Sequence, residues 1–194
     1  GIIEYQPDRT LRLTTVGFHY EINNLIQLIE LPNPNPKEAP KNQFVNAGTN
    51  KAWGAEFEAE KLWDYGSRLR ASYTWTNAYD ASNSQQLVNS PSNLFKLNFS
   101  TPLFNHWLRA GAEAQYTSGR KGRDGTHTAG YPLFNLTLTS GDKLFKGPLE
   151  GLEISGSIYN LLDRGYASVA SDEFAQHFIP QNGRNLRLVF SYRF

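Results

Sequence analysis

The last ten residues, Asn185-Leu186-Arg187-Leu188-Val189-Phe190-Ser191-Tyr192-Arg193-Phe194, alternate between polar and apolar side chains with the single exception of Val189. Successive side chains of a β-strand point to opposite faces, so this pattern predicts a strand with one apolar and one polar face. About ten residues is the length of a tilted strand that crosses a bilayer, and it exceeds the five or six residues usual in soluble sheets. The stretch therefore predicts the last strand of a membrane β-barrel.

The same period of two recurs along the chain, most clearly at 68–75 and 95–100. Apolar runs separated by segments rich in Gly, Pro, Asn and Ser predict nine strands, at about 1–5, 11–30, 43–61, 68–79, 93–102, 108–117, 132–141, 149–160 and 183–194. These segments predict an all-β fold of antiparallel strands.

The connections between these segments alternate in length. Four are short, at 6–10, 62–67, 103–107 and 142–148, and four are long, at 31–42, 80–92, 118–131 and 161–182. Short periplasmic turns and long extracellular loops are typical of outer-membrane barrels, and all eight connections fit if Phe194 ends at the periplasm. The fold class that we expect is an antiparallel transmembrane β-barrel segment in the bacterial outer membrane.

Composition supports this interpretation and narrows the function classes. Aromatic residues make up 13% of the chain, the formal net charge is +1, and cysteine is absent. Lys and Arg are interspersed with carboxylates, so we expect no nucleic-acid partner, and without Cys there is no disulfide or thiolate site. The first residues, from Gly1 to Tyr5, lack the basic and apolar regions of a signal peptide, so we expect that the start of an exported protein lies outside this sequence.

Aromatic residues gather near the predicted strand ends, as they do in the two girdles of a membrane barrel. On the short-turn side are Trp63, Tyr65, Phe104, Trp107 and Phe145, and on the long-loop side are Tyr20, Tyr79, Tyr116 and Tyr159. A soluble β-sandwich that acts as a binding module is an alternative, but it leaves these bands and the strand lengths unexplained.

Three glutamates, Glu56, Glu58 and Glu60, share one face of a predicted strand, and the next strand presents Arg68 and Arg70 after a short turn. Paired carboxylates can perform acid–base chemistry, but a polar barrel interior also requires cross-strand ion pairs. The neighbouring arginines favour the ion pairs. We find no enzyme signature in the sequence, and we predict no cofactor.

The long loops carry the candidate ligand-contacting residues, which are Arg120, Lys121, Arg123, His127 and His177. A basic cluster raises the local concentration of anions, so Arg120, Lys121 and Arg123 could attract an anionic ligand such as an iron chelate. His127 and His177 lie in long loops where a chelate or porphyrin could touch them, although surface histidines with no special role are the commoner case. A solvated loop, or one that touches lipopolysaccharide phosphates, explains the cluster equally well. None of the four histidines pairs with a second ligand at metal-binding spacing, so we predict no metal site.

Three segments together resemble the C-terminal barrel of TonB-dependent outer-membrane receptors, the siderophore and nutrient receptor family. They are 46–58 (NAGTNKAWGAEFE), 158–166 (IYNLLDRGY), and Gly183-Arg184 followed by Tyr192-Arg193-Phe194. The family pattern is N-x-G followed by G-x-E-x-E, then N-L-x-D-x-x-Y, then GR before a last strand that ends in Y-x-F. In physical terms, Gly48 and Gly54 would relieve a long twisted strand, and Asn160 and Asp163 would cap a turn.

The resemblance implies a barrel of about 22 strands, plugged by an N-terminal domain that carries the TonB box. Residues 1–194 would then be the C-terminal part of the barrel, with the plug domain and the N-terminal strands outside this sequence. The implied function is TonB-dependent uptake of a scarce nutrient, most often a ferric siderophore. A complete small barrel that acts as a passive channel or adhesin is the alternative.

The resemblance also implies partners. They are outer-membrane lipid, the TonB complex through the N-terminal region, an iron chelate or similar small ligand, and the barrel-assembly machinery. Assembly would depend on a signal formed by Leu188, Phe190, Tyr192 and Phe194.

Overall fold

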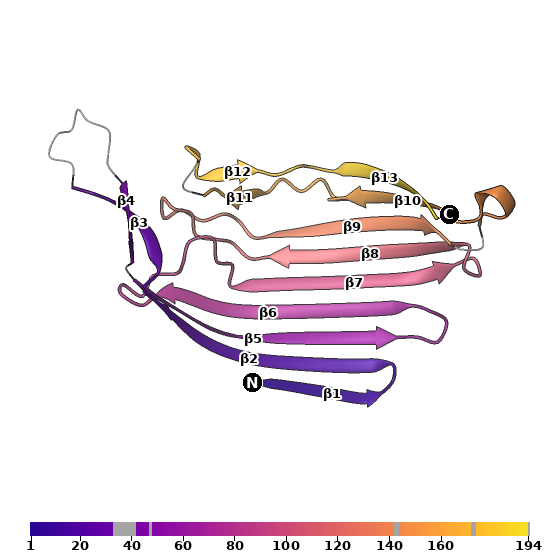
Figure 1. The fold of residues 1–194 in the computed structure, drawn as a ribbon, viewed down its shortest axis with the longest axis horizontal. Coiled ribbons are helices and arrows are strands. Elements are labelled where there is room, and N and C mark those ends of the chain that lie inside the picture. The colour runs from indigo at the N-terminus through magenta and orange to yellow at the C-terminus, as the bar shows by residue number, and fades with distance from the viewer. Residues whose placement is uncertain (33–41, 47, 142–143, 172–173, 194) are drawn as a thin grey trace.

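The computed structural model describes residues 1–32, 42–46, 48–141, 144–171 and 174–193. Nine antiparallel strands form one open, curved sheet in the order β1-β2-β5-β6-β7-β8-β9-β10-β13 (Figure 1). The strands are β1 (Ile2–Asp8), β2 (Leu11–Asn23), β5 (Thr49–Leu62), β6 (Arg68–Asp80), β7 (Asn93–Leu103), β8 (Leu108–Thr117), β9 (Tyr131–Ser140), β10 (Leu152–Tyr159) and β13 (Asn185–Tyr192). This sheet confirms the predicted all-β fold and the number of wall strands. No helix among the described residues is both long and apolar enough to cross a membrane.

The two longest predicted strands, 11–30 and 43–61, are each broken, which is a correction to the sequence-based expectation. Asn24 has a φ of 56° and Gly48 a φ of 86°, and both values leave the extended region. Between these two positions, β3 (Ile26–Glu30) and β4 (Asn42–Asn46) pair only with each other, and the hairpin that they form bends away from the wall (Figure 1). Gly48 therefore lies immediately before β5, whereas Gly54 lies inside it.

Two connections contain regular structure that the alternation did not predict. The long loop after β10 includes a short hairpin of β11 (Ala167–Val169) and β12 (Phe178–Pro180). The turn before β10 contains the 3-10 helix η1 (Gly147–Leu149), so β10 begins at Leu152 and not at 149. Both elements lie outside the nine-stranded wall.

Strand register separates the side chains into an inner polar face and an outer apolar face. One continuous inner row consists of Arg12, Glu60, Arg70, Asn98, Glu113 and Asn135. The adjacent outer row consists of Leu13, Ala59, Ala71, Leu97, Ala114 and Phe134. Outer side chains remain exposed, for example 49% for Phe57 and 64% for Phe190. An apolar surface of this extent is typical of a barrel wall that contacts lipid.

The aromatic bands differ in part from the expectation. Tyr116 lies on the outer face, but the register places Tyr20 and Tyr159 on the inner face. Trp53 and Trp75 form an edge-to-face pair with ring centroids 4.7 Å apart. Both lie on the outer face, since each is an even number of residues from an outer-row residue of its own strand, Ala59 for Trp53 and Ala71 for Trp75. The sequence-based assignment was wrong for Tyr20 and Tyr159 because proximity to a strand end does not specify the face.

Candidate functional site

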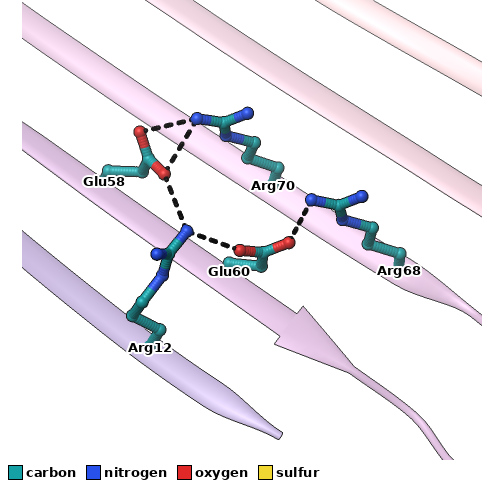
Figure 2. A network of polar contacts seen from close by, with 5 residues as sticks. All are labelled: Arg12, Glu58, Glu60, Arg68 and Arg70. Atoms are coloured by element: carbon teal, nitrogen blue, oxygen red, sulfur yellow. Dashed lines mark hydrogen bonds and ion pairs between the residues drawn. The ribbon is translucent and has the colours of Figure 1, made fainter. Parts of the chain in front are cut away.

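An ion network covers the inner face near the β5–β6 turn, and Figure 2 shows its five residues. The Arg12 guanidinium donates to Glu60 at 2.8 Å and lies 3.7 Å from Glu58. Arg70 pairs with Glu58 at 3.0 Å, and Arg68 pairs with Glu60. The predicted ion pairs across the hairpin are thereby confirmed.

Arg12 was missing from the sequence-based network. It comes from β2, which pairs with β5. The last pair of this ladder is Asn23 with Thr49, and 25 residues lie between them in the sequence. Arg12 and Thr14 lie on the same inner face of β2, opposite Glu60 and Glu58 of β5. The local sequence does not identify β5 as the partner strand. Three guanidinium groups surround two carboxylates, so the network forms a charged wall rather than a carboxylate pair that shares a proton. Exposed ion pairs of this kind contribute about 0–1 kcal/mol each.

Beside the network, the inner face forms an open groove of about 560 Å³. Its lining includes Arg70, Asn98, Glu113, Asn135 and Thr137. Asn135 donates to Glu113 at 2.8 Å, which satisfies part of the hydrogen-bonding capacity of the carboxylate. Within the part of the chain that the structure describes, no group of three or more His, Asp or Glu side chains could hold a metal ion.

The three loop cations proposed as ligand contacts connect neighbouring loops to one another. Arg120 donates to Asn89 Oδ1 at 3.0 Å, and Lys121 Nζ donates to Gln85 Oε1 at 2.8 Å. Both bonds join loop 118–130 to loop 81–92. Arg123 reaches the third loop, where it donates to the carbonyl oxygen of Ser171 at 2.8 Å. These contacts give the cations a role in loop packing, and their contact with a ligand stays a prediction.

The two candidate histidines lie in different surroundings. His127 is exposed and lines a pocket of about 320 Å³ between the loops. His177 lies near Asp124, and the pKa of the Asp124 carboxyl is lowered chiefly by a hydrogen bond from the Thr126 hydroxyl, with a smaller contribution from the charge of His177. Stability from this turn is therefore present above the ordinary pKa of aspartate and is lost as the pH falls through the lowered value. Of the five candidates, only His127 lines the pocket.

A polar clasp joins the end of β10 to the start of β13. Asn160 is 5% exposed, and its side chain donates to the Arg164 carbonyl at 2.9 Å and accepts from the Arg164 amide at 2.8 Å. Asp163 Oδ1 accepts from the Arg184 amide at 2.7 Å, and Gly183 leaves room for this carboxylate because a Cβ there would lie 2.6 Å from Oδ1. The expected turn-capping role of Asn160 is confirmed, whereas the Asp163 carboxylate binds the Arg184 amide at the far end of the loop and so helps to hold both ends of the long loop together.

We expect Asn160→Ala to destabilise the clasp by about 2 kcal/mol, because it removes three part-buried side-chain hydrogen bonds and places alanine at a φ of 50°. Hydrogen exchange of residues 161–184 in the complete receptor measures the effect. Asn160→Gly is the matched control, since it permits the left-handed backbone and loses only the side-chain bonds. Equal exchange rates in the Ala variant and the unmodified protein would contradict the assigned role.

The outer face of β13 carries most of the predicted assembly signal. Leu188 and Phe190 are 63% and 64% exposed, and Tyr192 is 46% exposed. Phe194 lies outside the described residues. Recognition by the assembly machinery therefore stays a prediction.

Comparison with known proteins identifies the family. The sequence profile described as "TonB dependent receptor-like, beta-barrel" matches residues 1–161. A search of curated proteins found no significant sequence match.

Solved structures of similar fold agree with this assignment. The FrpB iron transporter from Neisseria meningitidis is 18% identical, with a TM-score of 0.71 over 100% of this chain and 30% of that one. The siderophore receptor PiuA from Acinetobacter baumannii is 19% identical, with a TM-score of 0.72 over 98% of this chain and 27% of that one. The copper transporter OprC is 16% identical, with a TM-score of 0.74 over 98% of this chain and 30% of that one.

The chain thus spans less than a third of the length of each of these receptors and transporters. Its two-faced sheet and its sequence profile identify the same type of membrane wall. This chain belongs to the TonB-dependent receptor-like β-barrel family.

Proposed function

We propose that this chain is the C-terminal part of the wall of an outer-membrane receptor that takes up a scarce nutrient with energy supplied through TonB. The observation that carries the proposal is the two-faced sheet, in which an ion-paired inner face lies behind an exposed apolar outer face. Such a wall suits a protein that contacts lipid outside and encloses a polar interior. Family membership adds the coupling to TonB.

An iron chelate is the substrate that we propose. The similar solved proteins include an iron transporter and a siderophore receptor, which supports iron, but they also include a copper transporter. The plug domain, the remaining strands and the contact with TonB would come from the rest of the receptor.

A passive small barrel or adhesin is less well supported. Closure of such a barrel would require β1 to pair with β13, and these strands form opposite edges of the sheet. An unpaired strand edge is unfavourable in lipid, since its backbone groups find no water. Further strands of the proposed receptor would pair with both edges and satisfy these groups.

Uptake by cells tests the proposal. The complete receptor, produced in a bacterial strain that lacks its own iron-chelate receptors, should restore accumulation of radioactive iron from at least one chelate of a panel. Deletion of TonB should abolish this accumulation, because the proposed uptake draws its energy through TonB. Accumulation that persists without TonB would favour a passive channel and overturn the proposal, and copper accumulation without iron accumulation would overturn the substrate.

A further inference from the structure

A pocket, here called the loop pocket, lies between two extracellular loops. Its aromatic and basic lining has no evident role in the barrel wall. It has a volume of about 320 Å³ and is lined by His127, Tyr131, Arg164, Tyr166 and Phe178, together with small residues of the same loops. Its size is at the lower end of the range for small-molecule sites, which suits a single ring with its substituents. None of its lining residues carries a carboxylate.

Arg164 supplies an available positive charge to the loop pocket. Its guanidinium makes no hydrogen bond or ion pair with any residue that the structure describes, in contrast with the cations at 120, 121 and 123. Its backbone is nevertheless held on both sides of the Cα atom, because the Asn160 side chain accepts a hydrogen bond from the Arg164 amide and donates one to the Arg164 carbonyl. The guanidinium therefore extends from a hydrogen-bonded backbone and has no partner among the residues that the structure describes.

The other walls of the loop pocket are aromatic. The rings of Tyr131 and Tyr166 lie with centroids 4.5 Å apart and a tilt of 37°. Tyr131 is 8% exposed, so it forms a fixed wall. Burial raises the pKa of Tyr166, which keeps its phenol neutral and able to donate a hydrogen bond. Phe178 from β12 closes another side and packs against Gly122 of the neighbouring loop, where a Cβ would lie 2.7 Å from Cζ of the phenyl ring.

We propose that the loop pocket binds an aromatic ring that carries an anionic oxygen, with the ring against Tyr131, Tyr166 and Phe178 and the anionic oxygen at Arg164. An aromatic wall favours a planar apolar body, and a guanidinium without a carboxylate partner among the described residues favours an anion. His127 lies at the same pocket and adds a second donor. The inference rests on the proposed uptake function, because it assigns this chemistry to part of the transported ligand.

Three small probe molecules separate the contribution of the aromatic ring from that of the negative charge. Benzoate carries both features, benzamide keeps the ring without the charge, and cyclohexanecarboxylate keeps the charge without aromaticity. Saturation-transfer NMR and competition titrations on the purified complete receptor should show tighter binding of benzoate than of either analogue. Equal binding of benzoate and benzamide would overturn the role of the charge, and equal binding of benzoate and cyclohexanecarboxylate would overturn the aromatic wall.

Two substitutions test whether benzoate binds in the loop pocket. Arg164→Gln should weaken benzoate binding about tenfold or more, since a charge-assisted hydrogen bond is lost, and should leave benzamide binding unchanged. Arg184→Gln is the matched control, because Arg184 lies at the other end of the same loop and does not line the pocket. If both variants weaken benzoate binding equally, the effect is general electrostatics and the proposal fails.

The two proposals fail in different ways. TonB-dependent iron uptake without any preference for benzoate would overturn the loop pocket and leave the uptake function supported. Selective benzoate binding that depends on Arg164, in a receptor without TonB-dependent uptake, would support the pocket chemistry and overturn the uptake function together with the assignment of the ligand as transported.

Discussion

Gly54→Ala is expected to destabilise the barrel by about 3 kcal/mol, which is a large effect for one methyl group. A Cβ at this position would lie 2.2 Å from the carbonyl oxygen of Trp75 on the neighbouring strand and 2.7 Å from Cζ of Phe18. The Phe18 ring can rotate, but the backbone of β6 is held by the ladder that it forms with β5. The added methyl group must therefore separate two paired strands.

Gly17→Ala is the matched control. Gly17 lies on β2, one register position from the pair of Phe18 with Gly54, and a Cβ there would meet no atom within 4 Å. We expect a change of less than about 0.5 kcal/mol, as for other uncrowded surface positions. Urea unfolding of the complete receptor in lipid vesicles, followed by tryptophan fluorescence, measures both variants. Equal midpoints for the two variants would contradict the close strand approach at Gly54.

Alternation predicted the wall of this protein well because lipid and the polar interior impose opposite requirements on successive residues. The pairs of Glu58 with Arg70 and Glu60 with Arg68 follow from a short turn, whose length alone brings the two strands into register. Information of this kind is local. It was therefore available from the residues without any knowledge of the fold.

Features that depend on distant segments were not predictable in the same way. Arg12 joins the ion network across a long loop, and no local pattern identifies β5 as the partner of β2. The two long predicted strands are interrupted at Asn24 and at Gly48, where the backbone φ is positive. The presence of glycine does not by itself predict such a break, because Gly54 lies inside a continuous strand. In both cases the sequence allowed more than one arrangement.

The candidate ligand-contacting residues also depend on contacts between distant segments. Charge clustering singled out Arg120, Lys121 and Arg123, but these cations pair with Asn89, Gln85 and Ser171. Arg164 was part of a recognised motif and was not proposed as a ligand contact. Arg164 differs from the other three cations because its guanidinium has no partner among the described residues. This difference depends on contacts between loops, which the sequence does not show.

Leu97→Arg is expected to destabilise the receptor in a bilayer by about 2–4 kcal/mol, the cost of a cation on the lipid face near the membrane midplane. Leu97 lies in the middle of β7 on the outer row, between Ala71 and Ala114. The next residue, Asn98, occupies the inner row between Arg70 and Glu113 and lines the polar groove. Asn98→Arg places the same side chain one residue away, where Glu113 offers a counter-charge.

The pair of variants tests the orientation of the entire sheet, because register fixes which face each residue occupies. Unfolding of the complete receptor in vesicles should show a large loss for Leu97→Arg and a change of less than about 1 kcal/mol for Asn98→Arg. In detergent micelles, which adapt around a charged side chain, the difference should shrink. A larger loss for Asn98→Arg than for Leu97→Arg would mean that the polar row faces lipid, and the assignment of the ion network and the groove to the barrel interior would then be wrong.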